Sequence, residues 1–400
     1  MTIRRTLLRA AFTFAALLTL SGPLPVAHGA SAAHQESTYP YTFTDLAAQR
    51  VTIEKKPERF ALAYYVPNFL MVGGDAALAR VVGLSKDGWG AVRVGEEKLF
   101  TRAYPALSAL PSIGSYHDDT LATERILALK PDVLIISKMQ YAANAARLPI
   151  FERAGIKVVA LDYHSMQPER HQASTEILGR LLEREATAAA LNARAATVLE
   201  TIRNRIAALP AAERGRATYV ELGNQGVAHY GNTYNGEILW GGILKFLDAG
   251  NIATGMKTPY GAVTREFVLA ANPKTIIIAG SIWDNKHASD QMRMGMTVSE
   301  SEAQARLAGF AARPLWERLD AVKNGELYAV DHGSLRNAFD YTSVMFLAKV
   351  LYPKTFADFD PAGELRALYA RYLPAIKLEG TFFLKLKAPT AHNAAAERAQ

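Results

Sequence analysis

The chain has 400 residues, of which 50% are hydrophobic and 21% are charged. A chain of this length and composition buries one large core or two moderate ones, and it does not have the composition of a disordered protein. It contains no cysteine, which excludes disulfides, thiolate metal sites, a cysteine nucleophile and a lipid-modified N-terminal cysteine. Its 45 basic and 38 acidic side chains give a formal charge of +7.

The N-terminus has the pattern of an export signal. Three arginines precede an apolar run over residues 10–20, and small side chains follow at residues 30–32. We therefore predict a cleaved signal peptide over residues 1–32 and a soluble mature protein in the periplasm. Arg4-Arg5 resembles a twin-arginine motif, but Ile3 stands where that motif has a polar residue, so the general export route is favoured while both stay open. Without these three arginines the chain keeps 42 basic and 38 acidic residues, a charge of +4, so no nucleic-acid-binding patch is expected.

Six short apolar runs predict buried strands, and helical patterns lie between most of them. The runs are Phe60–Tyr64, Val133–Ser137, Val158–Leu161, Ala217–Leu222, Thr275–Ala279 and Leu327–Val330. Strands that alternate with helices favour an α/β fold of mostly parallel sheets flanked by helices.

An internal repeat indicates two lobes of similar plan. Residues 124–136 align with residues 266–278 at a constant offset of 142 residues, and the Glu, Leu, Ala, Pro and terminal Ile positions coincide. Each copy has the pattern of a short helix that stops before a proline and leads into a buried strand. Chance similarity between two helix–strand units is the alternative.

A long helix is predicted between the lobes. Residues 183–209 contain no glycine or proline and are dominated by Ala, Leu, Arg and Glu, which are strong helix formers. A helix of this length spans about 40 Å and suits a rigid strut between two lobes; a coiled-coil partner helix is the alternative. We therefore predict an N-terminal lobe at 41–168, a helical segment at 169–210, a C-terminal lobe at 215–388 and a flexible tail at 389–400.

Six motifs, taken together, carry a family resemblance. They are Val51–Arg59, Glu124–Pro131, Gly155–Asp162, Gly179–Glu185, Thr264–Glu266 and Leu315–Val330. Their order and spacing resemble the helical-backbone class of periplasmic substrate-binding proteins, which serve ABC importers of ferric siderophores, haem and cobalamin. The resemblance implies two lobes joined by one long backbone helix. It also implies a monomer without enzymatic activity that binds a metal chelate and works with an ABC permease and its ATPase.

The resemblance also assigns two docking residues. In such proteins one exposed carboxylate on each lobe docks onto basic residues of the permease, and Glu124 and Glu266 match those positions by motif. The internal repeat independently makes these two residues equivalent. Exposed ion pairs contribute only about 0–1 kcal/mol each, but they steer and orient a partner. The alternative is that each glutamate only stabilises a helix N-terminus, and the two roles are compatible.

The loops after the predicted strands supply the candidate ligand site, because ligands of open parallel sheets bind beyond the carboxyl ends of the strands. Aromatic side chains offer flat apolar faces with a polar group, and an arginine can hold carboxylate or catecholate oxygens. These groups suit a large anionic metal chelate, and a histidine among them either pairs with the chelate or completes the coordination of its metal. The predicted ligand-binding residues are Tyr65, Trp89, Tyr116, Tyr141, Tyr230, Asn235, Trp283, His332 and Arg336.

These residues do not identify the chelate. A ferric siderophore, haem, cobalamin and a nickel or other metal complex are the candidates, in that order. A free-standing haem-, cobalamin- or metal-binding protein and an exported hydrolase are the alternative functions, although the chain has no phosphate-binding, dinucleotide-binding or nucleophile-elbow motif.

No resident cofactor or metal site is predicted, because the nine histidines show no close metal-binding spacing. Met292, Met294 and Met296 stand at every second position in an apparent insertion. We interpret them as packing residues or as part of a mobile flap, and a soft-metal site is the alternative.

Overall fold

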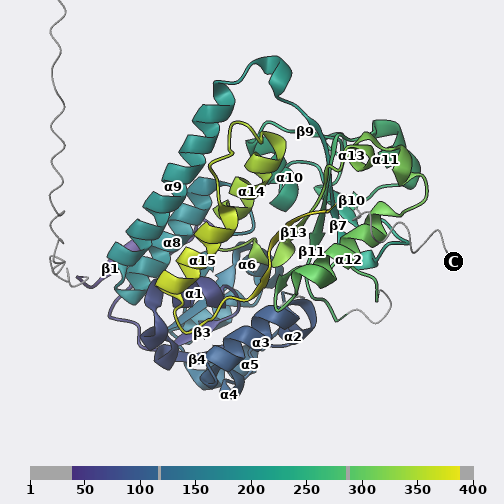
Figure 1. Cartoon of the computed structure of the whole chain (residues 1–400). Coiled ribbons are helices and arrows are strands. Elements are labelled where there is room, and N and C mark those ends of the chain that lie inside the picture. Colours follow the sequence, from purple (N-terminus) through teal and green to yellow (C-terminus); the bar gives the residue numbers. More distant parts are fainter. Residues whose placement is uncertain (1–37, 116–118, 285–288, 388–400) are drawn as a thin grey trace, which may run out of the picture. The chain divides into compact units, whose positions relative to one another are not determined.

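The structure is a computed structural model that describes residues 38–115, 119–284 and 289–387. The predicted signal peptide, the predicted tail from residue 389 and the candidate Tyr116 lie outside the described residues. The described chain forms two α/β lobes, each built on a mostly parallel sheet with helices on its faces, and Figure 1 shows the long helix α9 running along one side of both. The predicted fold class is therefore confirmed.

The N-terminal lobe contains a four-stranded parallel sheet of order β4-β3-β5-β6. Its strands are β3 (Phe60–Leu62), β4 (Val81–Leu84), β5 (Val133–Ser137) and β6 (Lys157–Leu161). Its helices are α1 (Val66–Gly73), α2 (Trp89–Val92), α3 (Val94–Ala103), α4 (Ala106–Ala109), α5 (Thr123–Leu129), α6 (Lys138–Asn144) and α7 (Leu148–Arg153), with a 3₁₀ turn η1 at Asp75–Arg80. A hairpin of β1 (Tyr41–Thr44) and β2 (Arg50–Ile53) precedes the sheet.

The C-terminal lobe contains a five-stranded sheet of order β15-β13-β11-β7-β9, in which only the edge strand β15 is antiparallel. Its strands are β7 (Ala217–Leu222), β9 (Gly250–Asn251), β11 (Thr275–Gly280), β13 (Leu327–Asp331) and β15 (Phe383–Lys385). Two small antiparallel pairs join β8 (Asn232–Tyr234) to β10 (Tyr260–Ala262) and β12 (Gly295–Met296) to β14 (Gly380–Thr381). The helices of this lobe are α10 (Leu239–Phe246), α11 (Arg265–Ala271), α12 (Glu300–Ala311) and α13 (Asp320–Lys323). Its short 3₁₀ turns are η2 (Ala211–Glu213), η3 (Gly223–Gln225), η4 (Trp316–Arg318) and η5 (His332–Ser334).

The two repeated sequence units take the same place in the two sheets. Strand β5 lies between β3 and β6, and β11 lies between β7 and β13, so three neighbouring strands of each sheet follow the same order. Helices α5 and α11 both end in a left-handed residue, Lys130 at φ 45° and Asn272 at φ 40°. Such a cap ends a helix abruptly, and each helix turns through it into the following strand.

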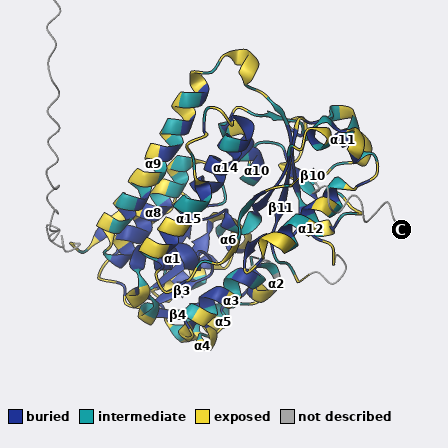
Figure 2. Ribbon diagram, viewed as in Figure 1, coloured by how far each residue is buried: buried dark blue, intermediate teal, exposed yellow. Residues whose placement is uncertain are grey.

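Four helices connect the lobes. Helix α8 (Pro168–Leu182) leads through the left-handed Glu183 into α9 (Glu185–Ala207), which spans about 35 Å at 1.5 Å per residue. Helices α14 (Tyr341–Leu351) and α15 (Pro361–Tyr372) follow β13 and pack on α9 and on α1 respectively. The strut is therefore one part of a helical layer, and Figure 2 shows exposed residues along the outer side of α9.

Three apolar clusters form the core. The largest contains one face of each sheet together with side chains of α1, α9, α14 and α15, so the two lobes share it. The second and third clusters cover the opposite faces of the C-terminal and N-terminal sheets respectively. Figure 2 shows the buried strands at the centre of each lobe. Within the described ranges, no helix has both the length and the apolar character that a membrane span requires.

Candidate functional site

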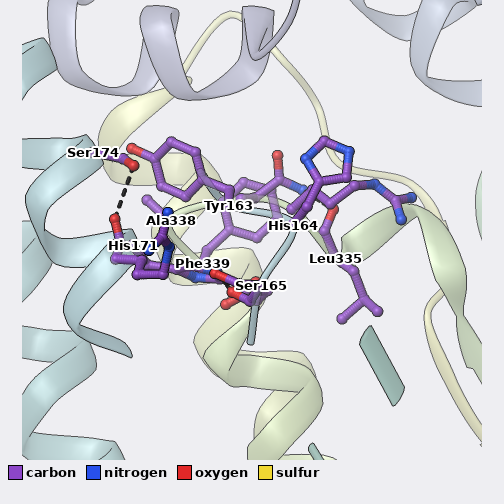
Figure 3. A network of polar contacts seen from close by, with 12 residues as sticks. Tyr163, His164, Ser165, His171, Ser174, Leu335, Ala338 and Phe339 are labelled. Atoms are coloured by element: carbon purple, nitrogen blue, oxygen red, sulfur yellow. Dashed lines mark hydrogen bonds and ion pairs between the residues drawn. The ribbon is translucent and has the colours of Figure 1, made fainter. Parts of the chain in front are cut away.

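Aromatic, histidine and arginine side chains follow the carboxyl ends of the parallel strands in both lobes. Tyr65 follows β3, His164 follows β6, and His332 and Arg336 follow β13. Figure 3 shows Tyr163 and His164 of the N-terminal lobe beside Leu335 and Ala338 of the segment after β13. We call two groups of residues together the cleft cluster: Tyr65 and His164 in the N-terminal lobe, and Trp240, Trp283, His332 and Arg336 in the C-terminal lobe.

Stacked tyrosines position His164 on the N-terminal side. The Tyr65 ring packs edge-on against Tyr64 and Tyr163, at centroid distances of 4.7 and 5.0 Å. The Tyr65 hydroxyl accepts the Tyr163 backbone N–H at 3.2 Å and lies 2.8 Å from Nδ1 of His164. Burial lowers the pKa of His164 to about 4, so this imidazole is neutral at neutral pH.

Two tryptophans surround His332 on the C-terminal side. Trp240 is fully buried in α10 and its Nε1–H donates to Nδ1 of His332 at 3.0 Å. The Trp283 ring, just beyond β11, lies 6.5 Å from the His332 ring. Burial, together with the nearby Arg93 cation, lowers the pKa of His332 to about 3, so His332 is also neutral.

Arg336 reaches the same place from a strained backbone. Its φ is +68°, in the left-handed region, which is unfavourable for a residue with a Cβ. Nη1 lies 3.5 Å from Nε2 of His332, Nη2 donates to the His332 carbonyl at 3.3 Å, and the buried Nε has no acceptor among the described residues. The buried amide of Asn68 in α1 holds this segment, because it donates to the Arg336 carbonyl at 3.1 Å and accepts the Ala338 N–H at 2.9 Å.

The lobes also meet at a second polar surface, beside β12. It encloses a cavity of about 30 Å³ lined by Arg93 and Glu96 of the N-terminal lobe and by Asp331 and Asn337 of the C-terminal lobe. Burial raises the pKa of Asp331 to about 6, although its carboxylate accepts the Ser334 hydroxyl at 2.7 Å.

A further cavity, of about 60 Å³, lies between the α8–α9 helices and helices α10 and α14, and it is largely apolar. At its edge His171 donates from Nε2 to the Ser165 carbonyl at 2.6 Å, and its Nδ1 lies 3.4 Å from Oδ2 of Asp340. Burial opposes a charge on His171, but Asp340 raises its pKa above the usual value. The Tyr163 ring lies 5.4 Å from His171 and 5.0 Å from Tyr65, and it links this ion pair to the cleft cluster.

Trp283, His332 and Arg336 lie together in the C-terminal lobe. Tyr65 lies in the N-terminal lobe at the start of α1, the helix whose Asn68 binds the Arg336 carbonyl. The other four described candidates lie elsewhere. Trp89 is 1% exposed and donates to Glu96 at 2.9 Å. Tyr141 packs on the cluster that covers the opposite face of the N-terminal sheet, Tyr230 accepts a hydrogen bond from Trp316 at 2.7 Å, and Asn235 donates to Glu237 and the Met256 carbonyl.

Two members of the cleft cluster had not been selected from the sequence. His164 lies three residues after a predicted strand, so the strand-end rule that selected Tyr65 could have found it. Trp240 lies inside a helix after the β8 strand, and no local signal distinguishes it from a core tryptophan.

The two predicted docking glutamates occupy equivalent positions. Glu124 and Glu266 are both exposed in the first turns of α5 and α11. The backbone N–H of Glu266 and the neighbouring Arg265 guanidinium, 3.1 Å away, lower the pKa of Glu266. Phe267 and Tyr260, 40% and 55% exposed, stand out among the large apolar side chains of this lobe.

The methionine trio is buried. Met292, Met294 and Met296 are 0%, 1% and 9% exposed and pack within the apolar clusters. In the part of the chain that the structure describes, no group of three or more His, Asp or Glu side chains is placed to hold a metal ion.

Comparison with known proteins gives one family and several related structures. A family model described as periplasmic binding protein matches residues 85–332. No curated protein sequence matches the chain. The TroA-like periplasmic binding protein FepB from Veillonella parvula is 30% identical over 87% of this chain and 100% of its own, with a TM-score of 0.80.

Two more distant structures share the fold. The molybdate periplasmic binding protein MolA from Haemophilus influenzae, bound to molybdate, is 18% identical over 85% of this chain and 100% of its own, with a TM-score of 0.60. A protein of an ABC-type Fe³⁺-hydroxamate transport system from Saccharomonospora viridis is 19% identical over 79% of this chain and 100% of its own, with a TM-score of 0.52.

Proposed function

The chain belongs to the periplasmic binding protein family and is the solute-binding component of an ABC transporter, and we propose that its solute is an anionic metal chelate, with a ferric siderophore as the first candidate. In this proposal the protein binds the chelate between its lobes in the periplasm. It then delivers the chelate to the permease, whose ATPase drives import.

The cleft cluster carries this proposal. Its buried Arg336 has a guanidinium nitrogen with no acceptor among the described residues, and leaving a buried charged donor unpaired is costly. An anionic ligand oxygen would satisfy it, while Trp283 and Tyr64 provide aromatic surfaces on the two sides. The cluster therefore favours a ligand with oxygen atoms at its periphery and an extended flat or apolar surface.

The relatives support the same direction. Two of them are named for Fe³⁺-hydroxamate transport and for molybdate binding, and both solutes have oxygen-rich surfaces. Because the family and the related structures are binding proteins, we favour transport over an exported hydrolase, and over a free-standing haem or cobalamin carrier.

A binding panel tests the ligand. The mature protein is titrated with ferric siderophores, haem, cobalamin and a nickel complex while intrinsic tryptophan fluorescence is followed, since Trp240 and Trp283 lie in the cleft cluster. Arg336→Ala should weaken an anionic chelate by about 1.5–3 kcal/mol, the value of a charged hydrogen bond. Arg318→Ala, at a side chain that is 75% exposed, is the matched control. If none of the four ligand classes binds, or if Arg336→Ala binds as the parent does, the proposed ligand site is wrong.

Docking is tested separately. We propose that Glu124 and Glu266 contact basic residues of the permease, and their exposure on equivalent helices supports this role. Charge reversal of both to Lys should abolish uptake of the chelate while its affinity for the purified protein stays unchanged. The control reverses Glu176 and Glu200, two exposed glutamates of α8 and α9. Equal loss of uptake in both double variants would refute the docking assignment.

A further inference from the structure

The tautomer of His332 is determined by its neighbour. The indole Nε1 of Trp240 can only donate a hydrogen bond, and it lies 3.0 Å from Nδ1 of His332. Nδ1 must therefore accept, and the single proton of the neutral ring is on Nε2. The ring is buried beside the Arg93 cation, which opposes a second proton.

The protonated Nε2 of His332 faces another donor. The nearest polar atom of Arg336, Nη1, is 3.5 Å away, and a guanidinium nitrogen cannot accept a hydrogen bond. Two donors that face each other at this distance do not form a hydrogen bond with each other. They converge instead on a place where an acceptor oxygen would receive both protons, and the buried Nε of Arg336 also lacks an acceptor among the described residues.

In the N-terminal lobe, His164 has the same arrangement, with a hydrogen-bond donor beside Nδ1. The Tyr65 hydroxyl accepts the Tyr163 N–H at 3.2 Å and has one proton of its own to donate. Tyr65 is 2% exposed, and among the described residues Nδ1 of His164, at 2.8 Å, is the acceptor placed to receive that proton. An unused buried hydroxyl proton is costly, so Nδ1 accepts and Nε2 of His164 carries the ring proton.

The proton positions in these two rings are the reverse of those in a histidine that binds a metal. A histidine that ligates a metal donates its second ring N–H to a carboxylate, carbonyl or water, which fixes the ligating nitrogen as the unprotonated one. In His332 and His164 the second nitrogen accepts from a protein donor instead. Neither ring can present a free Nε2 lone pair to a metal unless it breaks its bond to Trp240 or Tyr65.

We propose that His332 and His164 act, with Arg336, as hydrogen-bond donors to oxyanionic groups on the outside of the ligand, and do not coordinate its metal. This inference rests on the proposed function, because it names the class of ligand that the same cleft selects. The ligand has a metal that is already fully coordinated, and it carries anionic oxygens at its surface. A free oxyanion offers the same oxygens without the metal, and a bare metal cation offers none.

The first test reads the tautomers directly. In protein labelled with ¹⁵N-histidine, the ring nitrogen shifts and their couplings to ring protons show which nitrogen carries the proton in His332 and His164. We expect protonated Nε2 in both rings of the ligand-free protein, and His332→Gln and His164→Gln assign the signals. An unprotonated Nε2 in His332 at neutral pH would overturn the inference. This result does not depend on whether any chelate binds, so it separates this inference from the proposed function.

The second test uses matched ligands and matched substitutions. The ligands are a ferric tris-catecholate, which is anionic, a ferric tris-hydroxamate, which is neutral and equally saturated, sodium molybdate as a free oxyanion, and Ni²⁺ alone. We expect the tris-catecholate to bind at least about tenfold more tightly than the tris-hydroxamate, the difference that one charged hydrogen bond makes, and Ni²⁺ not to bind. Tighter binding of molybdate than of the tris-catecholate would identify a free oxyanion as the solute. Binding of Ni²⁺ with a shift of the His332 Nε2 signal would refute the donor role.

Two substitutions of His332 distinguish a donor from a ligand. Glutamine keeps an N–H donor but is a poor metal ligand, whereas methionine keeps a soft lone pair and has no N–H. We expect His332→Gln to keep the affinity for the tris-catecholate within a few-fold, and His332→Met to lose about tenfold or more. An equal loss in both variants would show that the affinity does not come from the N–H donor, as expected if His332 coordinates the hard Fe³⁺ ion, which neither glutamine nor a thioether binds well.

Discussion

The buried ion pair between Glu221 and Arg313 offers a sharp test of what stabilises the C-terminal lobe. The Arg313 guanidinium donates to both carboxylate oxygens of Glu221 at 2.7 and 2.9 Å, and the two side chains are 2% and 0% exposed. Glu221, in β7, also accepts the Tyr219 hydroxyl at 3.0 Å and the Gly231 N–H at 3.0 Å. Glu221→Gln removes the negative charge, keeps the shape of the side chain and leaves the buried guanidinium without its counter-ion.

The cost can be bounded from the contacts that remain. Removing one partner of a buried ion pair costs about 3–5 kcal/mol, because the other charge stays desolvated. Arg313 keeps carbonyl acceptors in the 226–229 loop, and its guanidinium lies 4.5 Å from the ring centroids of Tyr230 and Phe310. These contacts reduce the loss, but the new amide NH₂ faces an Arg313 donor in either orientation, so the expected loss is about 3–5 kcal/mol.

Equilibrium unfolding in urea, followed by fluorescence and circular dichroism, measures this loss. We expect the midpoint to fall with little change in the slope, because the surface exposed on unfolding is nearly the same. The control is Asp358→Asn, which removes the counter-ion of Arg205 at a carboxylate that is 58% exposed. That exposed pair should be worth less than about 1 kcal/mol. If Glu221→Gln costs no more than Asp358→Asn, burial does not control the value of this pair and the reasoning is refuted.

Three further predictions concern the cleft. The pKa of His332 is about 3 in the folded protein and about 6.5 in the unfolded chain. As the pH falls below ~6.5, the unfolded chain takes up a proton on His332 that the folded protein does not, so the free energy of unfolding decreases. Between pH 7.5 and pH 5, the free energy of unfolding in urea should therefore decrease by about 2 kcal/mol less in His332→Gln than in the parent. Equal decreases would show that His332 does not cause this pH dependence. A Cβ on Gly95 would lie 2.5 Å from the Met296 carbonyl oxygen, so Gly95→Ala should separate α3 from β12, enlarge the radius of gyration by X-ray scattering and weaken chelate binding. Gly255→Ala, which meets no atom within 4 Å, should change neither quantity. Asn68→Ala should cost about 1–3 kcal/mol of stability and reduce ligand affinity in a fluorescence titration, and unchanged affinity would show that the Asn68 amide does not position Arg336.

The sequence predicts the fold of each lobe well because the strongest signals are local. The apolar runs at Val133–Ser137 and Ala217–Leu222 form strands with these same bounds, since a strand buried on both faces must be continuously apolar. Strand β4 was not predicted, because Val81–Leu84 is short and contains Gly83, which weakens a strand pattern.

The association of the lobes could not be predicted in the same way. Helix α15 packs on α1, about 300 residues earlier in the chain, and an amphipathic pattern does not specify which distant surface a helix covers. The same holds for the strut. Its pattern predicts a helix, but two bidentate pairs that bind it to later parts of the chain appear only in three dimensions: Arg194 with Glu364 of α15, and Arg205 with Asp358 of the α14–α15 loop.

The candidate site, too, could be predicted only in part from the sequence. The strand-end rule depends only on local order, and it selected Tyr65, His332 and Arg336 because each follows an apolar run. Trp89 was selected further along the segment after the Phe60–Tyr64 run, but it is buried in the core and its indole donates to Glu96. A sequence cannot distinguish an aromatic side chain that points into a cleft from one that points beneath it. The sequence also cannot predict which ring nitrogen of His332 carries the proton, because that depends on a hydrogen bond from Trp240, 92 residues away.

The position of the donor groups has a consequence for how the lobes move. Asn68 binds the backbone at Arg336 and Ala338 to α1 of the N-terminal lobe, and His332 begins the same segment directly after β13. The segment therefore packs, through Leu335 and Ala338, on the core that both lobes share. Because a shared close-packed core resists large rotation, the angle between His332 and Arg336 should change little as the lobes open. An oxyanionic group could then bind to a preformed pair of donors before closure, and binding to a preorganised site avoids the entropic cost of ordering it.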